Sequence, residues 1–159
     1  MKRNMILALL IVLVVSVMAY ANVPTMSSVT AAKRLALEYY EQSDWRNAVE
    51  HLSLWEVEAQ AIASLTMAAT KPGTSPTALR ELPTPQLAVM TDYSEVSQKY
   101  SRERNEAIFL QAQCYYNLGE HKRAAECLER LFGLVSYRQW ELWTDARQLL
   151  NQILGLGIE

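Results

Sequence analysis

Apolar positions recur at spacings of three and four residues along most of this chain, which is the period of an amphipathic helix. The run from 45 to 69 contains no Gly or Pro, so it forms either one long helix or two helices that meet near Glu56–Glu58. No segment alternates apolar and polar residues between turn signals as a strand does. We therefore predict an all-α fold with helices over residues 29–42, 45–69, 86–100, 102–118, 120–132 and 137–154.

One segment, residues 71–85, interrupts this helical pattern. It holds Gly73 and four of the five prolines of the chain, at positions 72, 76, 83 and 85. Clustered Pro and Gly residues mark loops. A loop of this length is uncommon inside a compact domain, where long loops are often functional.

The N-terminus predicts export from the cytoplasm. Lys2 and Arg3 precede an apolar run, and Ala19-Tyr20-Ala21 follows it. A basic start, an apolar segment and an A-x-A site describe a secretory signal, which predicts cleavage after Ala21. An uncleaved anchor is the alternative, because residues 5–21 are just long enough to span a bilayer.

Both interpretations of the N-terminus place residues 22–159 outside the cytoplasm. The protein is periplasmic or secreted if residues 1–21 are removed, and otherwise a single-pass membrane protein with a cytoplasmic N-terminus. Residues 22–28 then form a linker and residues 29–155 a helical domain.

Charge and composition exclude several functions. The chain has 15 basic and 17 acidic residues without a basic stripe, so nucleic-acid binding is not expected. Cys114 and Cys127 flank Gly119 on opposite sides. A disulfide between them is possible in an oxidising compartment, but two buried thiols are favoured. With two histidines and no CxxC motif, we expect no metal and no cofactor.

Catalytic motifs are also missing from the sequence. It contains no Gly-rich phosphate loop and no HExxH, GxSxG or SxxK motif. Cys114 and His121 lie seven residues apart, but a turn separates them and no third group orients them. We therefore predict that the protein is not an enzyme.

A pattern of a tyrosine pair, a turn and an alanine occurs twice in the chain. The copies begin at Tyr39 and Tyr115, so they lie 76 residues apart. The first copy is Tyr39-Tyr40, Ser43-Asp44-Trp45, Ala48 and Leu52, and the second is Tyr115-Tyr116, Gly119-Glu120-His121, Ala124 and Leu128.

This pattern resembles the tetratricopeptide repeat (TPR), a helix–turn–helix unit of about 34 residues. The resemblance implies units at 29–62, 63–104 and 105–138, of which the middle one is degenerate, followed by a closing helix. Departures are Gln111, where the family usually has Leu, and Gln60 and Ser136, where it has Pro. A generic bundle of helical hairpins is the alternative.

The resemblance also implies packing roles. Small residues are required where the helices cross closely, and Tyr39 and Tyr115 fill the space between hairpins. Gly119 supplies the positive φ of the turn, for which Ser43 at the matching position is less suited. The small residues are Ala36, Ala48, Ala112 and Ala124.

In TPR scaffolds the first helix of each hairpin lines a binding groove. Phe109 and Tyr116 lie two helical turns apart, which suggests an amphipathic or extended peptide ligand. The alternative is that a neighbouring helix covers both. A carboxylate clamp is not reproduced, because Leu37 and Gln113 replace its asparagines. The candidate partner-binding residues are Lys33, Tyr40, Phe109, Gln113, Tyr116 and Asn117.

The expected function is therefore a protein–protein interaction scaffold acting outside the cytoplasm, similar to small exported or membrane-anchored TPR proteins of the bacterial envelope. A structural subunit of a membrane complex, held by an uncleaved N-terminal helix, is the alternative. Trp140 and Trp143 either pack the last helix or form an exposed patch. Because the repeats are few, a homo-oligomer is also possible.

Overall fold

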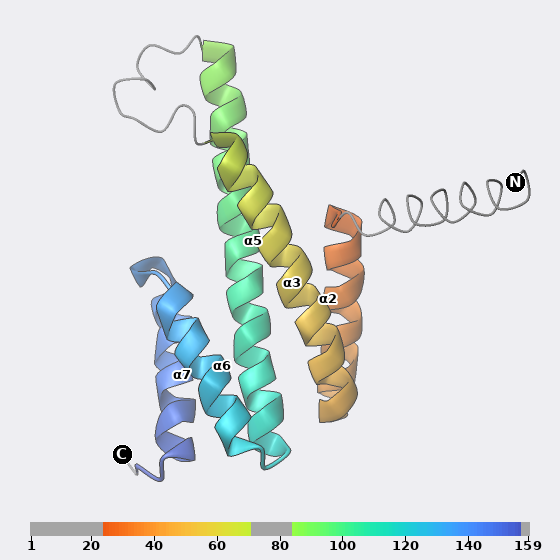
Figure 1. Cartoon of the computed structure of the whole chain (residues 1–159), viewed down its shortest axis with the longest axis vertical. Helices are drawn as coiled ribbons and strands as arrows, with labels where there is room; N and C mark the ends of the chain where they lie inside the picture. The colour runs from red at the N-terminus through yellow and green to blue at the C-terminus, as the bar shows by residue number, and fades with distance from the viewer. Residues whose placement is uncertain (1–23, 71–83, 157–159) are drawn as a thin grey trace, which may run out of the picture.

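The computed structural model describes residues 24–70 and 84–156. Within these ranges the chain forms five α-helices and one 3-10 helix and no strand, which confirms the predicted all-α class (Figure 1). The predicted signal or anchor at 1–21 and the loop residues 71–83 lie outside the described residues. The helices are α2 (Met26–Glu41), α3 (Trp45–Thr70), α5 (Thr84–Asn117), α6 (His121–Leu134), η2 (Tyr137–Gln139) and α7 (Trp140–Ile153).

Two of these helices are much longer than a TPR helix. The apolar run of α3 is one helix of 26 residues, which settles the alternative that the sequence left open. The predicted break between helices at 86–100 and 102–118 is wrong, because α5 continues through Ser101 for 34 residues. No Gly or Pro occurs between Gln86 and Leu118, so nothing in the backbone chemistry ends the helix there.

Several helix boundaries also differ from the prediction. α2 begins at Met26, so residues 26–28 are helical rather than linker. Thr25 and Ser28 form a reciprocal capping box, with Ser28 N donating to Thr25 Oγ1 at 3.1 Å and Thr25 N to Ser28 Oγ at 3.0 Å. α5 begins at Thr84 and includes Pro85, because the first turn of a helix does not need the missing N–H. α6 continues through Gly133, which was expected to end it.

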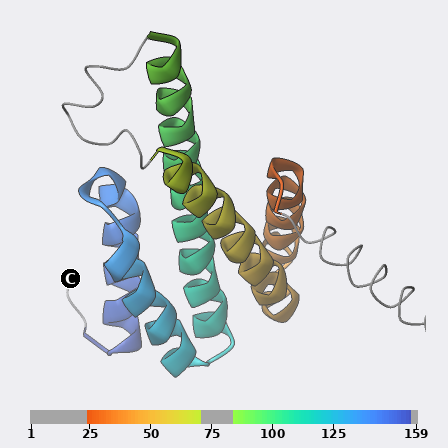
Figure 2. The same ribbon diagram turned by 45° about the horizontal axis from the view of Figure 1, so that its top comes forward.

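The two copies of the tyrosine motif form hairpins that are direct neighbours in space. α2 and α3 make the first hairpin, and the C-terminal part of α5 with α6 makes the second (Figures 1 and 2). Lys33 contacts Glu106, and Tyr40 contacts Gln113. Both contacts join residues 73 positions apart, so α2 and the end of α5 run parallel, as the first helices of adjacent repeats do.

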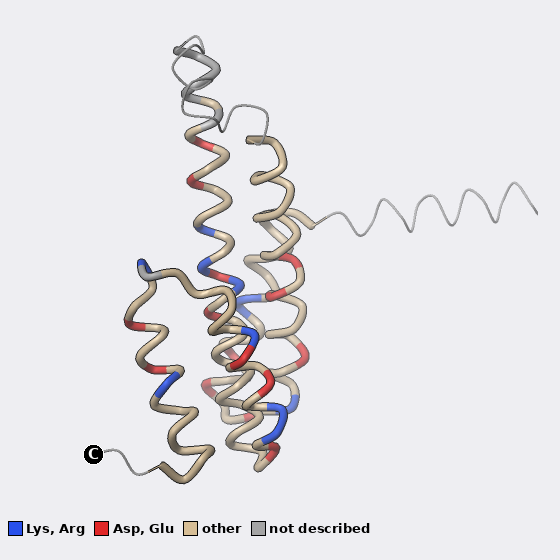
Figure 3. Tube along the Cα trace, turned by 60° about the vertical axis from the view of Figure 1, so that its left-hand side comes forward, with Lys and Arg blue, Asp and Glu red and all other residues tan. Residues whose placement is uncertain are grey.

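The expected middle unit at 63–104 is therefore absent as a separate repeat. Its described residues, 63–70 and 84–104, instead prolong α3 and α5 into an antiparallel pair that projects beyond the other helices (Figure 1). We call residues 59–70 and 84–101 the finger. Its α3 part carries no charged residue, as Figure 3 shows. Ser97 Oγ donates to Ala63 O at 3.0 Å and joins the two helices of the finger.

Two apolar clusters form the core. The first lies among α2, α3 and α5 around Trp55 and Leu52, and the second among α5, α6 and α7 around Ile108 and Leu128. The four alanines predicted at helix crossings are fully buried, with no exposed surface. Their small size lets the helices of each hairpin approach closely.

The two hairpin turns have the same backbone geometry. Ser43 N donates to Tyr40 O at 3.0 Å and Asp44 N to Tyr39 O at 3.0 Å. Gly119 and Glu120 repeat these bonds to Tyr116 and Tyr115 at 2.9 and 2.8 Å. This pair of bonds is the Schellman motif, which places one residue at positive φ.

Candidate protein-binding face

The sequence-predicted groove residues of the first helices come together on one side of the molecule, where α2 lies beside the end of α5. We call Lys33, Tyr40, Glu106, Gln113 and Asn117 the α2–α5 face. Each hairpin contributes side chains to this face because their first helices are parallel neighbours.

Lys33 is held in place by two groups, a carboxylate of α5 and an aromatic ring of α3. Its Nζ lies 3.2 Å from Glu106 Oε2 and 4.5 Å from the ring centroid of Trp55. Trp55 is fully buried, and its Nε1 donates to Glu103 at 3.3 Å. A cation above an aromatic face and beside a carboxylate loses rotamer freedom. Lys33 therefore connects the two hairpins instead of extending freely into solvent.

Tyr40 makes the second connection between the hairpins. Its hydroxyl donates to Gln113 Oε1 at 2.7 Å, and its ring packs edge-on against Trp45 at a centroid distance of 5.3 Å. Burial raises the pKa of the Tyr40 hydroxyl, and nearby Cys114 raises it further. The hydroxyl is therefore a donor at neutral pH. Gln113 uses its oxygen in this bond and keeps its amide N–H groups for another acceptor.

The second tyrosine motif repeats this arrangement. Tyr116 packs against His121 at a ring-centroid distance of 5.3 Å, the same distance as between Tyr40 and Trp45. His121 therefore packs on Tyr116 as Trp45 packs on Tyr40. Asn117 follows Tyr116 on the last turn of α5 and is exposed.

Phe109 does not belong to the open face. It is 9% exposed and lies in the second core cluster with Leu149 of α7. The sequence allowed a neighbouring helix to cover both Phe109 and Tyr116, and this is the arrangement found for Phe109. Tyr116 is half-buried, so part of its ring remains accessible. We therefore leave Phe109 out of the face.

Sequence reasoning missed Glu106, the partner of Lys33. The motif offset of 76 residues does not pair Lys33 with Glu106, because the contacts between the two first helices join residues 73 positions apart. Beside Lys33 the surface of α5 is hollowed over a volume of about 400 Å³. Its lining includes three carboxylates, Glu95, Glu103 and Glu106, and two cations, Lys99 and Arg102. The carboxylates outnumber the cations here, so this end of the face suits basic groups.

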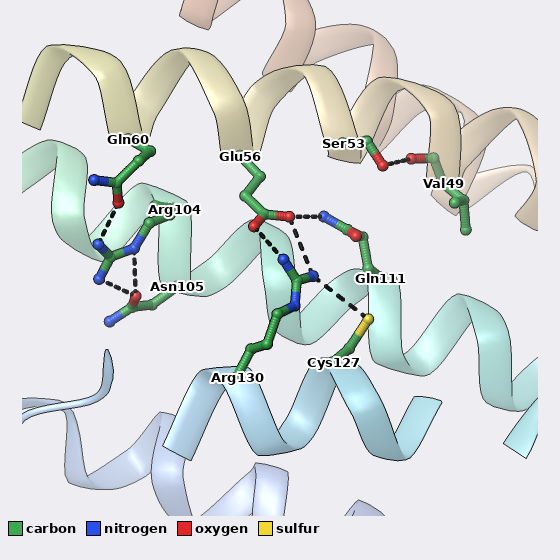
Figure 4. A network of polar contacts seen from close by, with 9 residues as sticks. All are labelled: Val49, Ser53, Glu56, Gln60, Arg104, Asn105, Gln111, Cys127 and Arg130. Atoms are coloured by element: carbon green, nitrogen blue, oxygen red, sulfur yellow. Dashed lines mark hydrogen bonds and ion pairs between the residues drawn. The ribbon is translucent and has the colours of Figure 1, made fainter. Parts of the chain in front are cut away.

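A polar network ties the hairpins together through their second helices (Figure 4). Arg130 of α6 donates to Glu56 of α3 at 2.7 Å, and Gln111 of α5 donates to the same carboxylate at 2.7 Å. Gln111, which stands where the family usually has Leu, is buried and therefore needs this partner. Arg130 also lies 3.8 Å from Cys127 Sγ.

A second polar group lies higher on α5, at the base of the finger (Figure 4). Asn105 is 1% exposed, and its Oδ1 accepts from Arg104 Nε at 3.0 Å and Nη2 at 2.7 Å. Arg104 Nη1 donates to Gln60 of α3. Asn105 Nδ2 donates to Gln139 at 2.7 Å, which fixes the connection between α6 and α7. Desolvation lowers the pKa of Arg104, although Glu56 opposes this shift.

Both cysteines are buried and not joined to each other. Cys114 belongs to the first core cluster and Cys127 to the second, so they face different parts of the molecule. Burial raises the pKa of the Cys114 thiol to about 12. The pKa of Cys127 is also raised by burial, and its hydrogen bond with Arg130 offsets only part of this shift. Such thiols are poor nucleophiles at neutral pH.

Of the two tryptophans of α7, one packs the helix and the other forms an exposed aromatic surface. Trp143 packs edge-on against Phe132 with ring centroids 6.2 Å apart, as a packing residue does. Trp140 stacks on Trp143 at 5.0 Å but is 64% exposed, as a patch residue is. The closing helix itself packs through Leu142, Ala146 and Leu149 as expected.

The described part of the chain has neither a candidate metal site nor a candidate membrane span. Residues 24–70 and 84–156 contain no group of three or more His, Cys, Asp or Glu side chains that could hold a metal ion. Among the helices in the same ranges, none combines the length and the hydropathy that a bilayer-spanning segment requires.

Two neighbouring hairpins with equivalent turns, closed by a further helix, define a helical-hairpin repeat protein. Residues 106–133 match the family model described as tetratricopeptide repeat. This match covers the second hairpin, from Glu106 of α5 to Gly133 of α6, and confirms the resemblance to the TPR family. No curated protein and no solved structure matches the chain.

Proposed function

We propose that this protein is a non-enzymatic interaction scaffold that presents the α2–α5 face to a segment of a partner protein. The observation that carries the proposal is the hydrogen bond between Tyr40 and Gln113, which joins the first helices of adjacent repeats on an accessible surface. The TPR match supports the same role, because such repeats commonly bind other proteins.

The chemistry of the face suits a peptide segment. The free amide N–H groups of Gln113 and the exposed Asn117 can pair with a peptide backbone, and the ring of Tyr116 can contact an apolar side chain. The Glu-rich hollow next to Glu106 favours Lys or Arg in the same segment. Because Lys33 and Tyr40 are already held by neighbouring residues, little side-chain entropy is lost on binding.

Photo-crosslinking tests the location of the face. A benzophenone amino acid is placed at Asn117 in one variant and at exposed Glu129 of α6 in another, and both are expressed in the source cells. We expect a discrete crosslinked partner from position 117 and none from position 129. The same crosslinked band from both positions would argue against a specific α2–α5 face.

Substitution tests the chemistry of the face. Tyr40→Phe keeps the ring and removes the hydroxyl, and Gln113→Ala removes the amide. Each removes about one hydrogen bond, so partner capture weakens several-fold while the helical circular dichroism is unchanged. Normal capture by both variants would mean that the partner binds elsewhere.

We place this role outside the cytoplasm because of the N-terminal segment. Lys2 and Arg3, the apolar run and Ala19-Tyr20-Ala21 support export. Intact mass of the protein purified from its own cells tests this step. A chain that begins at Asn22 indicates a secreted or periplasmic scaffold, and a chain that retains residues 5–21 in the membrane fraction indicates an anchored one.

A second candidate function is that of a structural subunit, and the finger favours it. Leu65 and Met67 of the finger are largely exposed, as is Val57 just before it, and residues 59–70 carry no charge. Exposed apolar surface without charge is typical of contact with another protein, including a second copy of this chain. Leu65→Glu should then release the protein from its assembly in sedimentation velocity. An unchanged sedimentation coefficient would count against this function.

A further inference from the structure

A cleft opens where the finger rises past the connection between α6 and α7. It has a volume of about 450 Å³ and lies between α5, the end of α3 and the segment 134–139. The part of α5 that lines the cleft, residues 97–105, lies at the base of the finger. In a TPR of ordinary length the first helix of the second hairpin would begin only near these residues, so it would not form the wall of such a cleft. The cleft therefore exists because α3 and α5 are prolonged.

The charge of this cleft is one-sided. Arg102 and Arg104 of α5 and Arg138 of η2 line it, and none of the described residues in its lining is acidic. The rest of the lining includes the amides Gln98, Asn105 and Gln139. A concave surface lined by cations and hydrogen-bonding groups attracts anions and concentrates them.

Arg104 is prepared for such a ligand. Its guanidinium is fixed by Asn105 and Gln60, so it is held by neutral oxygens and not by a carboxylate. These bonds use three of its five N–H donors, and two remain. Asn105 is buried and is itself fixed by Gln139, so the position of Arg104 is set before any ligand arrives. A preorganised arginine of this kind suits a carboxylate.

We propose that this cleft binds an acidic segment of a partner protein. The cations are distributed over α5 and η2, which fits a run of separate carboxylates better than one compact anion. The exposed apolar side chains of Met67 and Leu134 also line the cleft and can contact apolar residues between the acidic ones. This inference rests on the proposed interaction role and adds a second site to it, which adjoins the hollow at the end of the α2–α5 face through Arg102.

Fluorescence anisotropy of the purified full chain tests the proposal. The probe is a short fluorescein-labelled peptide of alternating glutamate and leucine, and its counterpart has glutamine in place of glutamate. We expect the glutamate peptide to bind at least tenfold more tightly, with an affinity that falls as salt is raised. Absent binding, or equal binding of the two peptides, would overturn the proposal.

Matched variants locate the site. Arg102→Ala combined with Arg138→Ala should weaken binding about tenfold or more, because each removes a charge-assisted contact. Lys99→Ala is the control, since Lys99 lines the neighbouring hollow on α5 but not the cleft, whereas Arg102 lines both. An equal loss in the control would mean non-specific attraction and would overturn the proposal, as would displacement of the peptide by equimolar inorganic phosphate.

The measurement also separates this inference from the proposed function. Peptide binding is followed on the purified chain with no partner present, and Tyr40→Phe should leave it unchanged. Lost peptide binding with normal crosslinking from position 117 rejects the cleft alone. Normal peptide binding without crosslinking at position 117 rejects the α2–α5 face alone.

Discussion

Ser43 and Gly119 occupy the same position in the two hairpin turns, and both have positive φ, 58° and 75° respectively. The backbone bonds around them are also the same, with each N–H donating to the carbonyl three residues earlier. Positive φ costs a non-Gly residue about 1–2 kcal/mol. The first turn therefore keeps a geometry that its own residue disfavours.

Ser43→Gly should stabilise the protein by about 0.5–1 kcal/mol, since relief of the strained φ exceeds the added entropy of the unfolded chain. Urea denaturation measures this change in the free energy of unfolding. A loss of stability would mean that the Ser43 side chain contributes more than its backbone conformation costs.

Two glycines provide a matched pair for the same argument. A Cβ added at Gly119 or at Gly133 meets no atom within 4 Å, but only Gly119 has positive φ. Gly119→Ala should therefore destabilise the protein by about 1 kcal/mol, whereas Gly133→Ala inside α6 should stabilise it by about 0.5–1 kcal/mol. If both substitutions changed the free energy of unfolding in the same direction, the positive φ of Gly119 would not be what disfavours alanine there.

The need for a small side chain where α2 crosses α3 can be tested by replacing alanine with leucine. Ala36 is fully buried between α2 and α3, so Ala36→Leu should destabilise the protein by about 1–3 kcal/mol through overpacking. Ala31 is exposed on the same helix, and Ala31→Leu should change stability by less than about 0.5 kcal/mol. Thermal unfolding of the two variants distinguishes these outcomes, and equal effects would place the crossing elsewhere.

The ion pair between Glu56 and Arg130 should contribute to the docking of the hairpins. The Glu56 side chain is only 17% exposed, so Arg130→Ala leaves a poorly solvated carboxylate and should cost about 1–2 kcal/mol. The exposed pair Lys122–Glu126, 3.9 Å apart, is the control, and Lys122→Ala should cost less than about 0.5 kcal/mol. Chemical denaturation of both variants measures the difference, and comparable costs would mean that the network is not stabilising.

Cys114 should make the protein less stable at high pH. Its folded pKa is about 12, above its ordinary value of 9.0, so below pH 9 the thiol is neutral in both states. Between these values the unfolded state releases a proton that the folded state keeps, so stability falls as pH rises, by at most about 1.4 kcal/mol per pH unit.

Unfolding midpoints between pH 8 and pH 11 measure this effect, with Cys114→Ala as the comparison. Tyr40 also has a raised pKa and contributes in the same direction. Because Cys114 also raises the Tyr40 pKa, the difference between the wild-type slope and the variant slope reports the thiol together with its effect on Tyr40. Identical slopes would mean that Cys114 ionises equally well in the folded protein.

The sequence predicted the local features of the fold well. The 76-residue match of the tyrosine motifs led to the correct hairpins, and the small residues at 36, 48, 112 and 124 are all buried. The positive φ at Ser43 followed from its match to Gly119. These features depend on residue type and local spacing, which a single sequence contains.

The tertiary arrangement could not be predicted in the same way. An offset of 76 residues fits an intervening repeat as well as two prolonged helices, and only the pairing of α2 with the end of α5 distinguishes them. The continuity of α5 through Ser101 depends on the absence of a stop signal, which is a weak indication. The burial of Phe109 depends on where α7 packs, and spacing along α5 carries no information about that.

The continuity of α5 also sets the distance between the arginine cleft and the α2–α5 face. Arg102 and Gln113 lie on one uninterrupted helix, so they are separated by about 16 Å along its axis at 1.5 Å per residue. An extended segment of about five residues spans that distance. On the two proposals, a partner that occupies both sites must therefore keep this fixed spacing between its acidic residues and the segment that binds beside Gln113.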